Sequence, residues 1–210
     1  MRLLKKAFAK TSRLISETNL SNVIVYAEFP KSGITVGSAI ITSLFLRSLD
    51  PSAPAVNRVN YSHYIGTLSN PIYIKNYGFS KTHETYSPAM KNVIYFVRNP
   101  VDVMGSYWEY LVKRGAISSL LLPTDFLLKT PYGINAWANH VRTYLSAPLE
   151  GVRHIWLRYE SLISGDKTIQ DIVKLYSLDV LSDHLAEFKQ KFSMKTWKEH
   201  EELWEFFCWP

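Results

Sequence analysis

A turn rich in hydrogen-bond donors, Pro30–Thr35 (PKSGIT), joins an apolar run to a stretch of helical length. The backbone N–H groups of such a turn, together with the positive end of the following helix dipole, favour a bound anion. Lys31 adds a positive charge, and the hydroxyls of Ser32 and Thr35 add further donors. The turn therefore predicts an anion site. An ordinary strand-to-helix turn with a solvated lysine is the alternative.

Two further groups of residues could take part in chemistry. The first is Lys81–His83 (KTH), whose histidine has an ordinary pKa near neutrality and could act as a general base. A surface histidine is the alternative there. The second is Arg98, at the end of an apolar run, with Ser106 in the next predicted helix. A guanidinium fork and a hydroxyl at a helix start suit a phosphate, although Arg98 could instead pair with Asp102.

The segments that must position these residues alternate between strand-like and helix-like patterns. The predicted strands are Val23–Ala27, Ile72–Lys81, Val93–Val97 and His154–Tyr159. The predicted helices run from the turn to about Ser48 and over Pro100–Lys113, Gly133–Ser146 and Asp166–Leu178. The predicted loops are Asp50–Asn70 and the residues that follow Lys113 through Pro123. This alternation predicts an α/β fold in which a parallel β-sheet is flanked by helices on both faces. Ligands of such sheets bind at the carboxyl ends of the strands, where the three groups of residues fall.

Composition narrows the class of protein. The 210 residues are 47% hydrophobic and 20% charged, which excludes a disordered or collagen-like chain. A net charge of +6 indicates an anionic partner, such as nucleic acid, an acidic membrane surface or a phosphorylated or sulfated small molecule. The single cysteine, Cys208, excludes a disulfide framework, and we find no metal-binding motif.

We expect a cytoplasmic protein without a transmembrane segment. The longest nearly apolar run, Val36–Leu46, is shorter than the ~20 residues that span a bilayer. The basic N-terminus has charges that interrupt every apolar run, so it lacks the continuous core of a secretory signal.

Taken in order, the motifs resemble those of the PAPS-dependent sulfotransferases, which use 3′-phosphoadenosine-5′-phosphosulfate as the sulfuryl donor. That family has PKSGTT where this chain has PKSGIT, then KTH, and then R-N-P-x-D-x-x-x-S-Y, which Arg98–Tyr107 (RNPVDVMGSY) fits. Trp137–Val141 (WANHV) is similar to the family's W-x-x-H-V, and Tyr159-Glu160 to its Y-E. The resemblance implies a P-loop NTPase-like three-layer sandwich.

The resemblance also implies roles for individual residues. Lys31, Ser32, Gly33, Ile34 and Thr35 would hold the phosphosulfate end of PAPS, with Lys31 stabilising charge on the bridging oxygen. Arg98 and Ser106 would bind the 3′-phosphate, and Tyr159 would lie near the adenine. His83 would take the proton from an acceptor hydroxyl, and Lys81 would support the same site. Such a site requires no metal.

The chain departs from the family pattern at several positions. Ile34 replaces a threonine, and Val36 stands where a tryptophan commonly stacks on adenine. The late family motif R-K-G-x-x-G-D-W-K-x-H keeps only its W-K-x-H part, at Trp197–His200. Lys191 fills the lysine position of that motif and would contact the donor, with a solvated lysine as the alternative.

We therefore expect a single sulfotransferase domain over 1–210, with a basic N-terminal helix over 1–21, a core over 22–178 and an abbreviated C-terminal segment over 179–210. Its acceptor would be a small molecule, glycan or lipid that bears a hydroxyl group. A nucleic-acid partner is not expected, because the positive charge is dispersed and no RNP-like strand is present. A non-catalytic protein that binds an adenine nucleotide and a P-loop kinase that uses ATP are the alternatives. The chain lacks the GxxxxGK[ST] loop that a P-loop kinase requires.

Overall fold

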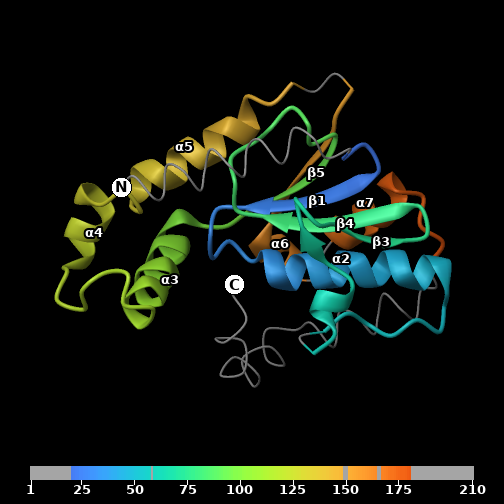
Figure 1. Cartoon of the computed structure of the whole chain (residues 1–210), viewed down its shortest axis with the longest axis horizontal. Coiled ribbons are helices and arrows are strands. Elements are labelled where there is room, and N and C mark those ends of the chain that lie inside the picture. The colour runs from blue at the N-terminus through green and yellow to red at the C-terminus, as the bar shows by residue number, and fades with distance from the viewer. Residues whose placement is uncertain (1–19, 58, 149–150, 165–166, 181–210) are drawn as a thin grey trace.

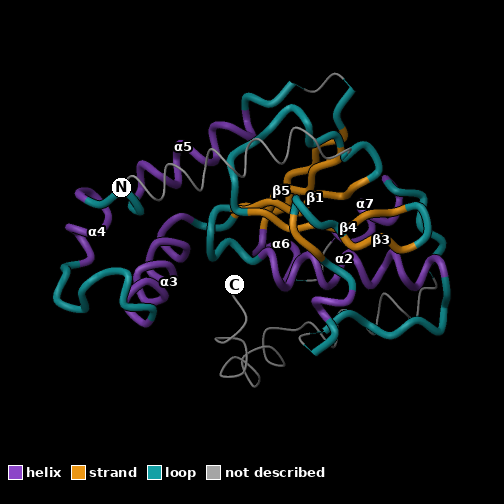
Figure 2. The backbone as a smooth tube through the Cα atoms, viewed as in Figure 1, coloured by secondary structure: helices purple, strands orange, loops and turns teal. Residues whose placement is uncertain are grey.

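The computed structural model describes residues 20–57, 59–148, 151–164 and 167–180 (Figures 1 and 2). Its strands form one sheet in the order β2-β4-β1-β5-β6, in which all neighbours are parallel, and β3 pairs antiparallel with β4. The strands are β1 (Val23–Glu28), β2 (Gly66–Thr67), β3 (Ile72–Ile74), β4 (Tyr77–Thr82), β5 (Asn92–Val97) and β6 (Arg153–Arg158). The predicted α/β fold with a largely parallel sheet is confirmed.

Helices cover both faces of this sheet, and Figure 1 shows α2 and α5 on opposite sides of it. The helices are α2 (Ile34–Leu49), α3 (Pro100–Lys113), α4 (Pro123–Lys129), α5 (Ile134–Leu145), α6 (Tyr159–Ile163) and α7 (Lys167–Leu175), with a 3-10 turn, η1 (Tyr61–His63). Every residue of β1 is buried, which explains why this central parallel strand is apolar from Val23 to Ala27 rather than in alternation.

The two faces carry different cores. On one face, Ile24 and Tyr26 of β1 pack with residues of α2, α6 and α7. On the other, Val25 of β1 packs with Tyr95 of β5 and Tyr144 of α5. A third cluster joins α3, α4 and α5 around Phe29, the residue that follows β1. The site residues predicted at the carboxyl ends of the strands therefore lie between two cores and a separate group of helices.

Three predicted elements differ from the observed ones. The segment predicted as one strand, Ile72–Lys81, is a hairpin of β3 and β4, and it turns at Lys75, whose φ is 53°. Pro123, predicted to end a loop, is the first residue of α4, because proline is well suited to a helix start. The predicted loop Asp50–Asn70 contains η1 and the short edge strand β2.

The predicted N-terminal helix lies outside the described residues except at its last two positions, and so do Lys191 and most of the predicted C-terminal segment. Among the described residues, none of the helices combines the length and the apolar character that crossing a bilayer requires.

Candidate active site

The β1–α2 turn follows the central strand. Lys31 and Gly33 both adopt left-handed backbone conformations, with φ values of 75° and 105°. Ser32 is buried, and its N–H donates to the Phe29 carbonyl at 3.2 Å. Gly33 has no Cβ, and the ring of Tyr159 occupies the space that a Cβ would need. This turn brings Lys31 to the sheet edge where β1 ends.

The start of α2 lacks a side-chain cap of the usual kind, because its N-cap residue is Gly33. The N–H of Ile34 instead donates to the carboxyl of Glu28, over 2.6 Å. Thr35 is half-buried, with its carbonyl 3.4 Å from the Ser38 hydroxyl. Val36, in α2, is partly buried against the core, and its aliphatic side chain has no aromatic face to offer a ligand.

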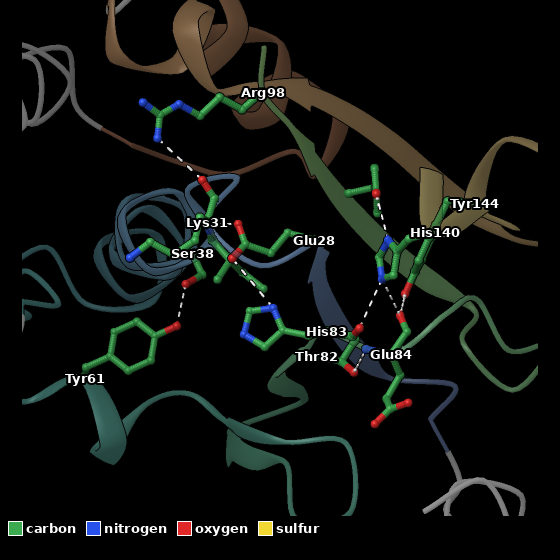
Figure 3. A network of polar contacts seen from close by, with 12 residues as sticks. Glu28, Lys31, Ser38, Tyr61, Thr82, His83, Glu84, Arg98, His140 and Tyr144 are labelled. Carbon is green, nitrogen blue, oxygen red and sulfur yellow. Dashed lines mark hydrogen bonds and ion pairs between the residues drawn. The ribbon is translucent and has the colours of Figure 1, made fainter. Parts of the chain in front are cut away.

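The β5–α3 turn lies beside the first one, because β5 is the parallel neighbour of β1. Arg98 follows β5, and its guanidinium donates to the Lys31 carbonyl at 3.4 Å. The same guanidinium lies 4.9 Å from the centroid of the Tyr159 ring. Ser106 lies half-buried in α3. Arg98 and Tyr159 are therefore brought to the Lys31 turn, as Figure 3 shows for Arg98.

The end of β4 supplies Lys81 and His83 on the other side of β1. Thr82 is the register partner of Ala27, so His83 follows β4 close to where β1 ends. The Lys81 ammonium lies 5.1 Å from the centroid of the Tyr61 ring, and the Tyr61 hydroxyl is 2.7 Å from the Ser38 hydroxyl. Lys81 and His83 thus face the β1–α2 turn from the opposite neighbour to Arg98.

Helix α5 fixes the backbone that carries His83. One ring nitrogen of His140, Nε2, lies 3.1 Å from the His83 carbonyl and 3.0 Å from the Glu84 carbonyl. The Tyr144 hydroxyl donates to the Glu84 carbonyl at 2.8 Å, and the Tyr95 hydroxyl is 2.9 Å from Nδ1 of His140. The histidine of the WANHV motif therefore lies in a buried aromatic layer and touches the loop of His83.

Glu28 is a site residue that the sequence analysis missed. It is the last residue of β1, its side chain is 3% exposed, and Oε1 lies 3.6 Å from Nδ1 of His83 (Figure 3). Burial raises the pKa of Glu28 to about 8, although the Ile34 N–H and the charges of Lys31 and Lys81 act in the opposite direction. The available signal was a lone acidic residue at the end of an apolar strand, directly before the PKSG turn.

Burial also controls the protonation of His83. It lowers the pKa of His83 to about 4, and the positive charges of Lys81 and Lys31 act in the same direction. His83 is therefore neutral at pH 7 and holds a lone pair that can accept a proton. Among the described residues, no group of three or more His, Cys, Asp or Glu side chains has the arrangement of a metal site.

Comparison with solved structures identifies the fold. Over 89% of this chain and 69% of the other, the structure is similar to mouse sulfotransferase SULT7A1 complexed with PAP, with a TM-score of 0.59 and 19% identity. The chain has the sulfotransferase fold. Retinol dehydratase in complex with androsterone and inactive cofactor PAP is also similar, with a TM-score of 0.62 and 13% identity over 91% of this chain and 71% of the other. No family model and no curated protein sequence matches the chain.

The sulfotransferase fold thus holds several of the predicted site residues at one edge of its sheet. Lys31, Arg98 and Tyr159 are joined by the contacts described above, and Lys81 and His83 approach from the neighbouring strand. Ser106 lies further along α3, and Lys191 lies outside the described residues.

Proposed function

We propose that this protein transfers a sulfuryl group from PAPS to an acceptor hydroxyl, with His83 as the general base. The observation that carries the proposal is the arrangement of Lys81, Lys31 and Arg98 at the ends of three adjacent strands, β4, β1 and β5, beside a neutral histidine. Adjacent parallel strands that end together form the ligand-binding edge of such sheets.

The residues present fit a donor with two separate anionic ends. Lys31 and the left-handed turn around it suit the phosphosulfate end, since Lys31 supplies a charge and the turn supplies backbone N–H groups. Arg98 lies one strand away, where its planar fork suits a second phosphate, and that phosphate distinguishes PAPS from ATP. In this structure the Ile34 N–H is occupied by Glu28 and the Ser32 N–H by the Phe29 carbonyl, so the charge of Lys31 and the remaining groups of the turn carry the fit.

The proposed reaction is an in-line transfer between two oxygens. The acceptor oxygen forms a bond to sulfur while the bond from sulfur to the bridging phosphate oxygen breaks. His83 takes the proton of the acceptor hydroxyl, and Lys31 stabilises the charge that develops on the leaving oxygen. As in phosphoryl transfer, positioning and charge stabilisation provide most of the rate enhancement. The acceptor is a small molecule, glycan or lipid with a hydroxyl group.

A non-catalytic nucleotide-binding role is the second candidate, and two observations favour it. Glu28 occupies an N–H at the start of α2, and Val36 faces the core, so two contacts that would hold the donor are reduced. The hypothesis of a P-loop kinase is disfavoured because the residue that follows β5 is Arg98 rather than an acidic residue that could hold magnesium.

Ligand-induced thermal stabilisation separates these classes. We expect 3′,5′-phosphoadenosine to raise the melting temperature more than ATP with magnesium does, because Arg98 offers a site for the 3′-phosphate. The sulfotransferase proposal would be contradicted if ATP with magnesium raised the melting temperature and 3′,5′-phosphoadenosine did not.

Transfer of labelled sulfate from PAPS to a panel of phenols, alcohols, glycans and lipids tests catalysis directly. His83→Ala should lower kcat by ~10²–10⁴, the usual contribution of a general base, while 3′,5′-phosphoadenosine still binds. The matched control is His63→Ala, because His63 is exposed in η1. Equal kcat for the two variants removes His83 from the mechanism, and binding without transfer to any acceptor supports the non-catalytic role.

A further inference from the structure

The carboxyl group of Glu28 lies between the β1–α2 turn and His83. One oxygen, Oε2, accepts the N–H of Ile34 at 2.6 Å, and the other, Oε1, lies 3.6 Å from Nδ1 of His83. The side chain of Glu28 therefore has a fixed end at the start of α2 and a second end directed at the imidazole.

Capping α2 does not by itself account for a glutamate at this position. Glutamate is rarely fully buried, and an uncharged acceptor such as serine or asparagine satisfies a helix N–H without bringing an ionisable group into the core. Glu28 is nevertheless 3% exposed. The oxygen that the cap does not use is the one that faces His83. This arrangement points to a role for the carboxyl in the chemistry of the imidazole.

His83 is held on two sides. Its carbonyl lies within hydrogen-bonding distance of His140 on α5, and the next carbonyl along the chain, that of Glu84, is bound by His140 and Tyr144. Its ring has one nitrogen turned towards Glu28, and the other is turned away from it (Figure 3). The backbone of His83 is thus positioned by α5, and its ring faces Glu28 of β1. The second ring nitrogen, Nε2, is directed away from Glu28 (Figure 3).

We propose that Glu28 is a positioning residue for His83, holding the Nδ1–H of the imidazole so that Nε2 accepts the proton of the acceptor hydroxyl. This inference rests on the proposed function. The two groups act as the carboxylate and histidine of a serine-protease triad do, where the carboxylate fixes the tautomer and stabilises the imidazolium. The distance of 3.6 Å is longer than a hydrogen bond, and such contacts commonly tighten when substrate binds.

The charges around the pair set the pH at which it works. Lys31 from the turn and Lys81 from β4 face Glu28 and favour its ionised form, and Tyr95 from β5 lies within electrostatic range. His140 from α5 and the same two lysines disfavour a charge on His83. Burial outweighs the lysines and raises the pKa of Glu28 to about 8, so below that pH the pair holds its proton on the carboxyl.

The direction in which kcat changes with pH follows from the proton on the Glu28 carboxyl. A protonated carboxyl donates to Nδ1 instead of accepting from it, and the imidazole then carries its own hydrogen on Nε2. Only the ionised carboxyl leaves Nε2 as the basic nitrogen. The kcat of the wild-type protein should therefore rise with pH, about tenfold for each unit, up to a plateau near the pKa of the pair.

The decisive variant is Glu28→Gln, whose amide oxygen can still accept the N–H of Ile34 but cannot titrate. We expect its kcat to be independent of pH between 6 and 9. On the wild-type plateau, its kcat should be about 10- to 100-fold lower, the range for loss of one charge-assisted hydrogen bond. Glu28→Asp should keep the rise of kcat with pH.

Glu109→Gln is the control, because Glu109 is an exposed carboxylate on α3. The proposal is overturned if the kcat of Glu28→Gln still rises with pH as in the wild type and stays within twofold of the wild-type value. Glu28 would then be only a cap of α2.

A second measurement needs neither donor nor turnover. An ¹⁵N NMR titration of the histidine rings, with His83→Gln to assign the signals, reports the tautomer and ionisation of His83. We expect the His83 signals of the wild type to change as Glu28 titrates and those of Glu28→Gln to lack this step. Identical titrations overturn the pairing even if sulfuryl transfer is observed. A step that depends on Glu28, in a protein that transfers no sulfuryl group, supports the pairing and refutes the proposed function instead.

Discussion

Two strand-to-helix turns lie side by side at the edge of this sheet, and they are built in opposite ways. The β5–α3 turn is a conventional helix start: Asn99 accepts the N–H of Val101 at 2.9 Å, and Pro100 is the first helical residue. The N–H of Asn99 is bound by Glu160. The β1–α2 turn instead has left-handed residues at Lys31 and Gly33 and no cap from its own N-cap residue.

The difference separates two ways of binding an anion. In the β5–α3 turn, side chains bind the N–H groups of Asn99 and Val101, and the group that the turn offers an anion is the guanidinium of Arg98. The β1–α2 turn offers a lysine and backbone donors other than the N–H groups of Ser32 and Ile34, which Phe29 and Glu28 occupy, at the cost of strained backbone angles. We therefore expect substitutions in the β1–α2 turn to affect rate and stability together. A substitution in the β5–α3 turn should instead change either the affinity for the donor or the free energy of unfolding, but not both.

The largest effect is expected for Lys31→Ala. Loss of a charge beside the leaving oxygen should lower kcat by ~10²–10³, with weaker binding of 3′,5′-phosphoadenosine. Lys75→Ala is a close control, because Lys75 is also a lysine with positive φ but lies in the exposed β3–β4 hairpin. Steady-state kinetics and isothermal titration of both variants check this, and equal losses would show that backbone conformation rather than charge position matters.

Arg98→Ala should weaken binding of 3′,5′-phosphoadenosine by about 10- to 100-fold, the cost of a lost charged hydrogen bond. Binding of adenosine 5′-phosphate should change little, because Arg98 is assigned to the 3′-phosphate. Arg158→Ala is the control, since Arg158 ends the neighbouring strand β6 with its side chain 74% exposed. Equal losses for the two nucleotides would contradict the assignment.

Gly33→Ala should lower the free energy of unfolding by ~1–3 kcal/mol, because alanine is strained at a φ of 105°. Its Cβ would also displace the Tyr159 ring, and with it the packing against Arg98. Gly115→Ala has the same left-handed strain, at a φ of 66°, with no atom within 4 Å of the new Cβ. Chemical denaturation of both variants measures how much the contact between the new Cβ and Tyr159 adds to the loss of stability. Similar losses in the free energy of unfolding would mean that the Tyr159 ring moves aside without destabilising the protein.

The smallest effect is expected for Asn99→Ala, which removes only the cap of α3. We expect a loss of about 1 kcal/mol in the free energy of unfolding and unchanged affinity for 3′,5′-phosphoadenosine. Asn99→Ser should retain most of the stability, because serine is also a good cap. A clear loss of nucleotide affinity in Asn99→Ala would mean that the two turns are more alike than their geometry indicates.

Prediction from sequence worked best where local chemistry decides the structure. The bounds of α3 match the predicted Pro100–Lys113, since Asn99, Pro100 and Asp102 all mark a helix start. Prediction was wrong for the β3–β4 hairpin, because a left-handed Lys75 carries no sequence signal of the kind that glycine gives. The start of α4 at Pro123 did have a signal, the proline itself, which was interpreted as a loop residue.

The site shows the same division. The motif residues of each turn could be named from the sequence, because the chemistry of Lys31 or Arg98 is evident from residue type and position. Glu28 was missed because the predicted strand stopped at Ala27, and only the structure places its carboxyl beside His83. The contact of His140 with the His83 loop joins residues distant in the chain, which a single sequence does not reveal.

The parallel pairing of β1 with β5 has a consequence for how the molecule is assembled. Arg98 and Lys31 are 67 positions apart, and they meet only after β1 and β5 have paired, with Val25 opposite Val93. Closing a loop of this size loses chain entropy before any contact is gained, and folds rich in such distant pairings form slowly. A nascent or partly folded chain would thus contain both residues without the contact between the Arg98 guanidinium and the Lys31 carbonyl. Recovery of nucleotide binding during refolding would mark the moment at which the centre of the sheet closes.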